Sequence, residues 1–90
     1  METIDLGNGV VCKIYNNGDK YWYLNGKRHR TDGPAVEDVD GRKCWYINGK
    51  LHRIDGPAIE WVNGDKLWCI NGKGYTEEEF NIIKQVLWAV

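Results

Sequence analysis

The chain has 90 residues, of which 42% are hydrophobic and 28% charged, and its formal net charge at pH 7 is −1. This length predicts one domain, and the composition excludes a disordered chain. The small negative charge argues against a general nucleic-acid or membrane-surface binder, which would carry a basic excess. No apolar run approaches the roughly 18 residues that a membrane span needs, and the N-terminus lacks the pattern of a signal peptide. We therefore expect a cytoplasmic protein with no membrane contact.

The cysteines support an intracellular environment. Cys12, Cys44 and Cys69 are odd in number, and none belongs to a CxxC pair. Small secreted domains usually carry an even set of cysteines that forms disulfides. We interpret the three thiols as small apolar side chains that fill the core.

The first predicted strand covers residues 10–15, within an N-terminal segment of residues 1–17. We expect this strand to lie at an edge of the sheet, with nothing paired to its outer side. An unpaired edge can accept a strand from a second copy or from another protein. Lys13 would protect the edge in part.

The middle of the chain, residues 18–75, repeats itself. The stretch WYLNGKRHRTDGPA begins at Trp22 and returns as WYINGKLHRIDGPA at Trp45, and a shorter third copy, WCINGKGYTEEEF, begins at Trp68. The three copies start 23 residues apart. Fixed periods of about 20–50 residues are typical of stacked repeat architectures.

Glycine pairs mark the turns between the repeated strands. Asn-Gly and Asp-Gly favour two-residue hairpin turns because both residues tolerate positive φ, and the Asp-Gly-Pro segments add a further bend. One series of pairs is Asn17-Gly18, Asp40-Gly41 and Asn63-Gly64, and the other is Asn25-Gly26, Asn48-Gly49 and Asn71-Gly72. We predict a mainly β protein, an antiparallel meander with strands at 10–15, 19–24, 27–30, 35–39, 42–47, 50–53, 58–62 and 65–70.

Strand alternation divides this meander into two faces. The face whose apolar residues recur in every repeat is the predicted core face: Trp22, Leu24, His29, Val36, Trp45, Ile47, His52, Ile59, Trp68 and Ile70. The face with mixed tyrosine, arginine and glutamate is the predicted presented face: Tyr21, Tyr23, Arg28, Arg30, Glu37, Cys44, Tyr46, Arg53, Glu60 and Leu67. A shift of one residue in register would exchange the two faces.

The last segment, residues 76–90, predicts a capping helix over residues 77–89. Thr76 and Glu79 have the spacing of a capping box, and acidic residues suit the first turn of a helix. The broad apolar side of the helix comprises Phe80, Ile82, Ile83, Val86, Leu87, Ala89 and Val90, and would cover the open end of the sheet. Trp88 falls on the polar side instead.

The repeated unit WYxNGKxHRxDGPA resembles the MORN-variant repeats of bacteriophage and giant-virus proteins and of bacterial antitoxin-like proteins. The resemblance covers roughly residues 17–73, and leaves out residues 1–12 and the helix. It implies an elongated stack of antiparallel hairpins, in agreement with the predicted meander. The family assigns no catalytic residues, so the resemblance implies none here.

The repeated histidines and aspartates predict structure rather than chemistry. A metal site needs three or four converging ligands, whereas His29 and His52 belong to separate copies of the repeat. We expect the repeated aspartates to bond backbone N–H groups or neighbouring side chains at the bend. A cysteine nucleophile would need a histidine base, and Cys44 is predicted on the face opposite His52. We therefore expect no enzyme activity, metal or cofactor.

Protein binding is the function that the sequence favours. The expected contact residues are Tyr21, Tyr23, Arg28, Arg30, Tyr46 and Arg53 on the presented face, together with Trp88. The viral resemblance implies a phage-encoded inhibitor of a host protein, in antiviral defence or CRISPR immunity. One alternative is a module that binds a nucleotide or a single strand, although Glu37 and Glu60 would repel phosphate. The other is an antitoxin-like or structural protein that self-assembles through its N-terminal edge strand or its C-terminal helix.

Overall fold

A computed structural model describes residues 1–88. It confirms a mainly β chain in which an antiparallel, meander-like sheet is followed by a C-terminal helix. The elements are β1 (Glu2–Gly7), β2 (Val10–Ile14), β3 (Lys20–Leu24), β4 (Lys27–Arg28), β5 (Val36–Glu37), β6 (Lys43–Cys44), β7 (Tyr46–Ile47), β8 (Lys50–Leu51), β9 (Ile59–Glu60), β10 (Lys66–Ile70), β11 (Lys73–Tyr75) and α1 (Glu77–Trp88).

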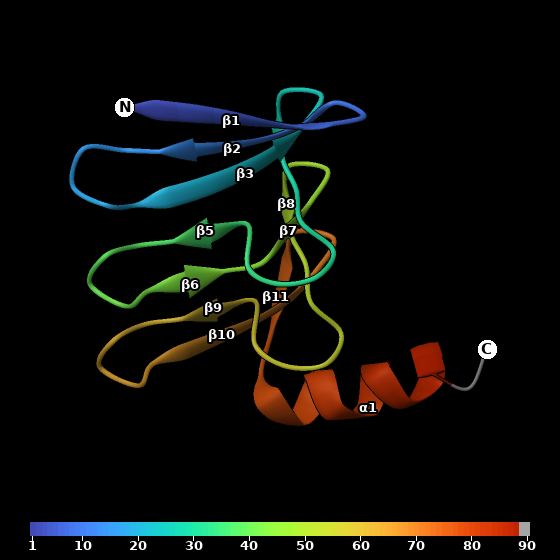
Figure 1. Ribbon diagram of the computed structural model, residues 1–90. Coiled ribbons are helices and arrows are strands. Elements are labelled where there is room, and N and C mark those ends of the chain that lie inside the picture. Colours follow the sequence, from blue (N-terminus) through green and yellow to red (C-terminus); the bar gives the residue numbers. More distant parts are fainter. Residues whose placement is uncertain (89–90) are drawn as a thin grey trace.

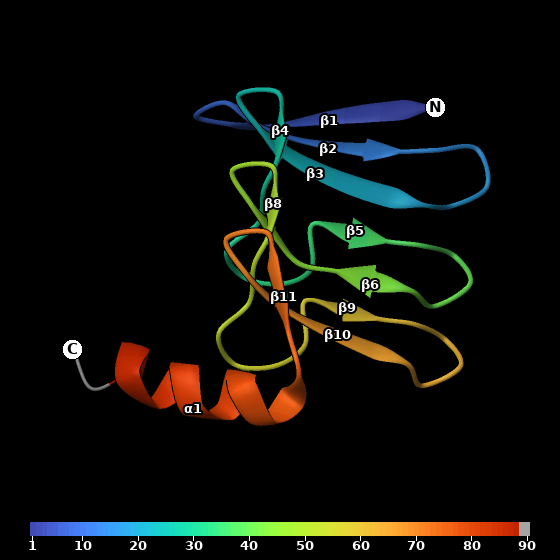
Figure 2. The same ribbon diagram turned by 180° about the vertical axis from the view of Figure 1, so that it is seen from behind.

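The hairpins are stacked in rows along the molecule (Figure 1). The main sheet has the order β1-β2-β3-β5-β6-β9-β10-β11, with β4 paired to β3, while β7 and β8 form a separate two-stranded sheet. Figures 1 and 2 show β7, β8 and β11 running across the direction of the other rows, and α1 lying at the C-terminal end of the stack. The molecule is flat, with principal extents of 40 × 32 × 17 Å.

The N-terminal edge differs from the prediction. Residues before position 10 form β1, which pairs with β2 in antiparallel register from Glu2 opposite Ile14 to Gly7 opposite Val10. The strand predicted at residues 10–15 is therefore internal, and the exposed edge strand is β1. The Asn8-Gly9 turn joins β1 to β2, with φ values of 56° and 81°.

The two series of glycine turns have different conformations. Asn25, Asn48 and Asn71 have positive φ together with the glycine that follows each, which confirms two-residue turns there. In the other series only the glycine has positive φ, and the Gly18 N–H donates to the Tyr15 carbonyl at 2.9 Å. This is a longer loop built on a type I turn with a left-handed glycine, so the two-residue prediction was wrong there.

Register also corrects the predicted faces. Val36 lies opposite Cys44, which in turn lies opposite Ile59, so these three side chains share one face of the sheet. They form the buried cluster of the core. The prediction had placed Cys44 on the opposite face from Val36 and Ile59. The prediction failed because the chain leaves the sheet at the Asp-Gly-Pro bend. Residue alternation along one strand therefore does not fix the face of the strand that follows the bend.

The helix begins as predicted. The Thr76 N–H donates to Glu79 Oε1 at 2.9 Å, and the Glu79 N–H donates to Thr76 Oγ1 at 3.1 Å, which completes the capping box. Phe80 is 1% exposed, and α1 packs against β10 and β11. The apolar side is buried only in part, since Ile82 and Val86 are exposed. The Trp88 side chain, and the predicted apolar contacts of residues 89–90, lie outside the described part of the chain.

Candidate functional site

The predicted contact residues separate into two groups in the structure. Tyr21 and Tyr46 pack against the core cluster, and Arg28 lies against both of their rings and opposite Tyr23. Arg30 and Arg53 belong instead to the two Asp-Gly-Pro bends, because β4 ends at Arg28 and β8 ends at Leu51.

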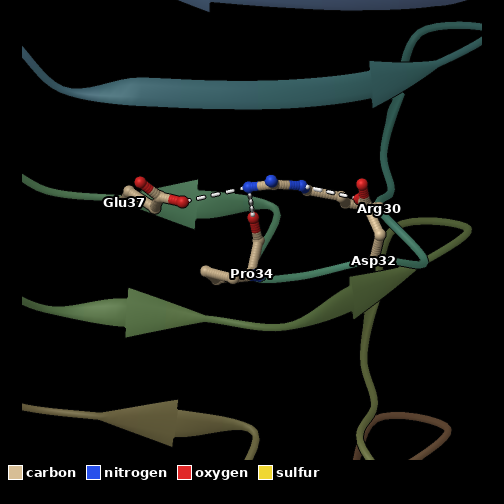
Figure 3. A network of polar contacts seen from close by, with 4 residues as sticks. All are labelled: Arg30, Asp32, Pro34 and Glu37. Carbon is tan, nitrogen blue, oxygen red and sulfur yellow. Dashed lines mark hydrogen bonds and ion pairs between the residues drawn. The ribbon is translucent and has the colours of Figure 1, made fainter.

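Arg30 ties its bend to the sheet (Figure 3). Its Nε donates to Asp32 Oδ1 at 2.9 Å, and its Nη1 donates to the Pro34 carbonyl at 3.1 Å and to Glu37 Oε1 at 2.9 Å. The guanidinium carbon lies 4.0 Å from the centre of the Trp22 ring. The hydrogen bond from Arg30 holds the pKa of the Asp32 carboxyl below its ordinary value. These contacts satisfy the charge of Arg30 within the chain.

The second bend repeats this arrangement. Arg53 donates to Asp55 at 2.8 Å, to the Pro57 carbonyl at 3.0 Å and to Glu60 at 2.9 Å. Its guanidinium carbon lies 3.8 Å from the centre of the Trp45 ring. A Cβ added at Gly56 would come within 2.9 Å of that carbon, so the guanidinium occupies the space that a side chain would need.

The repeated histidines link one hairpin to the next. The Asn48 N–H donates to His29 Nδ1 at 3.0 Å, and the Asn71 N–H donates to His52 Nδ1 at the same distance. Each histidine therefore holds the Asn-Gly turn of the following copy, and its Nδ1 is an acceptor. Within residues 1–88, no group of three or more His, Cys, Asp or Glu side chains could hold a metal ion.

An open cleft of about 610 Å³ lies on the tyrosine side of the sheet. We call it the tyrosine cleft, and its lining is Met1, Tyr15, Asn16, Asn17, Asp19, Tyr21, Tyr23 and Arg28. β3 supplies Tyr21 and Tyr23, and β4 places Arg28 directly opposite Tyr23. The Tyr15 and Tyr21 rings meet edge to face, with their centroids 5.1 Å apart. The cleft thus collects three tyrosines and one arginine.

Arg28 is held between aromatic rings. Its guanidinium carbon is 5.3 Å from the centre of the Tyr21 ring and 5.4 Å from that of Tyr46, within the range of cation–π attraction. Burial alone would lower the pKa of Arg28, but hydrogen bonding to Tyr46 and Tyr23 outweighs it and raises that pKa. Lys13 adds a second cation, with Nζ 5.1 Å from the centre of the Tyr23 ring.

A larger cleft of about 740 Å³ lies between the two bends. Trp45, Ile47 and His52, which belong to the predicted core face, line it together with Arg30 and Arg53. These core-face residues are only half-buried, so the prediction that this face forms the core was wrong here. The bound carboxylates leave both arginines of this cleft without unpaired charge.

The cysteines are buried, and burial raises the pKa of the thiols of Cys12, Cys44 and Cys69. A raised pKa lowers the thiolate fraction at neutral pH and with it the nucleophilicity of the sulfur. Each thiol fills space in a core, as expected from its position in the strands.

Sequence reasoning missed Tyr15 and the loop that follows it. The Tyr15 N–H donates to the Asp19 carbonyl at 2.9 Å, which sets the width of the loop and brings Tyr15 beside Tyr21. The signal was the position of Tyr15 directly before Asn16-Asn17-Gly18. That position predicts a contact between Tyr15 and Tyr21 only if the turn is assigned the longer type instead of the two-residue type.

The fold and the site define a mainly β stack of hairpins with a helix at one end and a tyrosine cleft near the other. No family model matches the chain, and neither does any curated protein or solved structure. Residues 1–88 contain one helix, α1, and its 12 residues are too few to cross a bilayer.

Proposed function

We propose that this chain is a non-enzymatic protein-binding module and that the tyrosine cleft is its contact surface. The observation that carries the proposal is the gathering of Tyr15, Tyr21, Tyr23 and Arg28 around one open cleft. Tyrosine and arginine are enriched among the residues that dominate binding energy at protein interfaces. Tyrosine offers a large contact area and a hydroxyl group at a small cost in side-chain entropy.

The site is organised before any partner arrives. Tyr21 packs against the buried cluster of the core, and the rings of Tyr21 and Tyr46 hold the Arg28 guanidinium. Side chains that are already ordered lose less entropy on binding, which favours affinity.

The resemblance to MORN-variant repeats supports the rest of the proposal. We propose that the chain belongs to that repeat family and that it acts as a phage-encoded inhibitor of a host protein, in the host cytoplasm. This part rests on the repeated motif WYxNGKxHRxDGPA rather than on the cleft.

The test is affinity capture from host lysate with three tagged versions of the chain. The first is the wild type, and the second is the double variant Tyr15→Ala/Tyr23→Ala, which leaves the core-packed Tyr46 intact. The third is Tyr75→Ala, a matched tyrosine deletion on β11, away from the cleft. Thermal unfolding of each variant checks that the fold is retained.

We expect the wild type and Tyr75→Ala to retain one host protein in near-stoichiometric amount, and the double variant to lose it. Equal retention by all three versions would remove the tyrosine cleft from consideration. A retained nucleotide or nucleic acid that is released steeply with added salt would favour a nucleic-acid module. Retention of the chain's own copies alone would favour a self-assembling structural protein.

A further inference from the structure

Arg28 differs from the other arginines of the chain. Arg30, Arg42 and Arg53 each make an ion pair of 2.9 Å or shorter. Among residues 1–88, no carboxylate makes an ion pair with Arg28. The unpaired guanidinium lines the tyrosine cleft.

We infer that Arg28 is the receptor for an aspartate or glutamate side chain of the partner protein. This inference rests on the proposed function and names the chemistry that the cleft recognises. The Tyr21 and Tyr46 rings lie against the Arg28 guanidinium, and hydrogen bonding to Tyr46 and Tyr23 engages part of its N–H groups. A guanidinium has five N–H donors in one plane, so a fork of donors remains for a ligand. That planar fork matches a carboxylate in a two-bond pair.

The charges around the cleft favour an anion. Arg28 and Lys13 are cations that lie against its tyrosines, and Asp19 is the carboxylate in its lining. Both oxygens of Asp19 are already used, because Oδ1 accepts from the Val39 N–H at 2.7 Å and Oδ2 accepts from Asn17 at 3.0 Å. The Met1 ammonium also lines the cleft and donates to Asn16 Oδ1 at 2.6 Å, so cations outnumber the carboxylate around the cleft.

A carboxylate fits this site better than a nucleic-acid strand. A strand carries one phosphate per nucleotide and is held by several cations along its path. Beyond the cleft, Arg42 is occupied by Asp38 at 2.6 Å, and the chain as a whole has a net charge of −1. A positive excess that is confined to one cleft suits an acidic side chain rather than a strand.

The test is an NMR titration of the full ¹⁵N-labelled chain, read at the Arg28 Nε–Hε signal. The probes are N-acetylated, amidated hexaglutamate, the matched hexalysine, inorganic phosphate and an oligothymidylate of six nucleotides. We expect a saturable shift of the Arg28 signal with hexaglutamate and none with hexalysine. Arg28→Gln should weaken hexaglutamate binding at least tenfold, whereas Lys27→Gln, which removes the same charge from the adjacent exposed position, should not.

Arg28→Lys provides a second variant that keeps the charge but loses the fork, and it should also weaken binding. The inference is overturned if hexaglutamate produces no saturable shift, or if Arg28→Gln binds it as well as the wild type does. Tighter binding of phosphate or of the oligothymidylate than of hexaglutamate would also overturn it. If Arg28→Gln still captures the host protein while Tyr15→Ala/Tyr23→Ala does not, this inference fails and the proposed function stands. If both variants capture it, the proposed function fails.

Discussion

Arginine has two different roles in this small chain. Arg30 and Arg53 each share one positive charge between two carboxylates and a proline carbonyl, and so fix the Asp-Gly-Pro bends against the tryptophans. Arg28 lines the tyrosine cleft, and no carboxylate among residues 1–88 makes an ion pair with it. The pair His-Arg occurs in both copies and supplies Arg30 and Arg53, whereas the second copy has Leu51 at the position of Arg28. Arg28 is the last residue of β4, and Arg30 lies beyond the end of that strand.

Removing Arg53 tests the structural role. Arg53→Ala should lower the free energy of unfolding by about 2–3 kcal/mol, because charged hydrogen bonds are lost and Glu60 is left without its partner. Arg28→Ala loses mainly cation–π contacts and should lower it by about 1 kcal/mol or less. Urea unfolding of both variants measures the difference. Equal losses would contradict the assignment of separate roles.

Acid should weaken the bend at Asp32. The folded-state pKa of Asp32 lies below its ordinary value of 3.8, so the unfolded state takes up the proton first as the pH falls. The stabilisation from Asp32 is therefore fully present above pH 3.8 and is lost as the pH falls through the folded-state pKa. Melting temperatures measured from neutral pH down to about pH 2 should fall less steeply for Asp32→Asn than for the wild type. Parallel curves would show that the ion pair contributes nothing.

At the scale of elements, the Asn-Gly turns connect the hairpins. The Gly49 N–H donates to the Arg28 carbonyl at 2.8 Å, and the Gly72 N–H donates to the Leu51 carbonyl at 2.8 Å. Each turn therefore touches the strand of the preceding copy. The histidine contacts beside them reinforce the same junctions.

Gly49→Ala tests the conformation of one such turn. Gly49 has φ of +81°, and an added Cβ would meet Lys27 at 3.7 Å, an ordinary contact. The penalty should come from backbone strain alone and amount to about 1–2 kcal/mol of unfolding free energy. Gly74→Ala is the control, since Gly74 lies in β11 without positive φ and its Cβ would meet Leu67 at 3.7 Å. A control as destabilised as Gly49→Ala would contradict the assignment of the loss to φ.

Local signals were sufficient for some elements of this fold. The capping box at Thr76 and Glu79 and the two-residue turns at Asn25, Asn48 and Asn71 depend on neighbouring residues, and the structure confirms them. The sheet faces depend on register across the bends, which alternation cannot follow. Arg30 was predicted to lie beside Arg28 on a strand of residues 27–30, but that strand ends at Arg28.

The sequence predicts only part of the candidate site. Tyr23 and Arg28 lie across one hairpin, so strand pairing alone brings them together. Tyr46 reaches Arg28 from the next copy, and Tyr15 reaches Tyr21 across a loop of the other turn type. Those two contacts depend on how hairpins stack and on how wide a loop is, and neither follows from alternation.

At the scale of the whole molecule, flatness explains why aromatic side chains remain accessible. A molecule only 17 Å thick has little interior, and its buried hydrophobic residues are mostly small. Those residues are Cys12, Ala35, Val36, Cys44, Ala58, Ile59, Cys69 and Phe80. The five tyrosines, and Trp22, Trp45 and Trp68, are therefore half-buried, with part of each ring available for contact.

The central claim is that the tyrosine cleft binds a partner protein. Its most direct measurement is calorimetric titration of the captured partner with the wild type and with Tyr15→Ala/Tyr23→Ala. Loss of two central aromatic contacts should weaken binding about 100-fold, or roughly 2.7 kcal/mol. Affinities within about twofold of each other, roughly 0.4 kcal/mol, would contradict the claim.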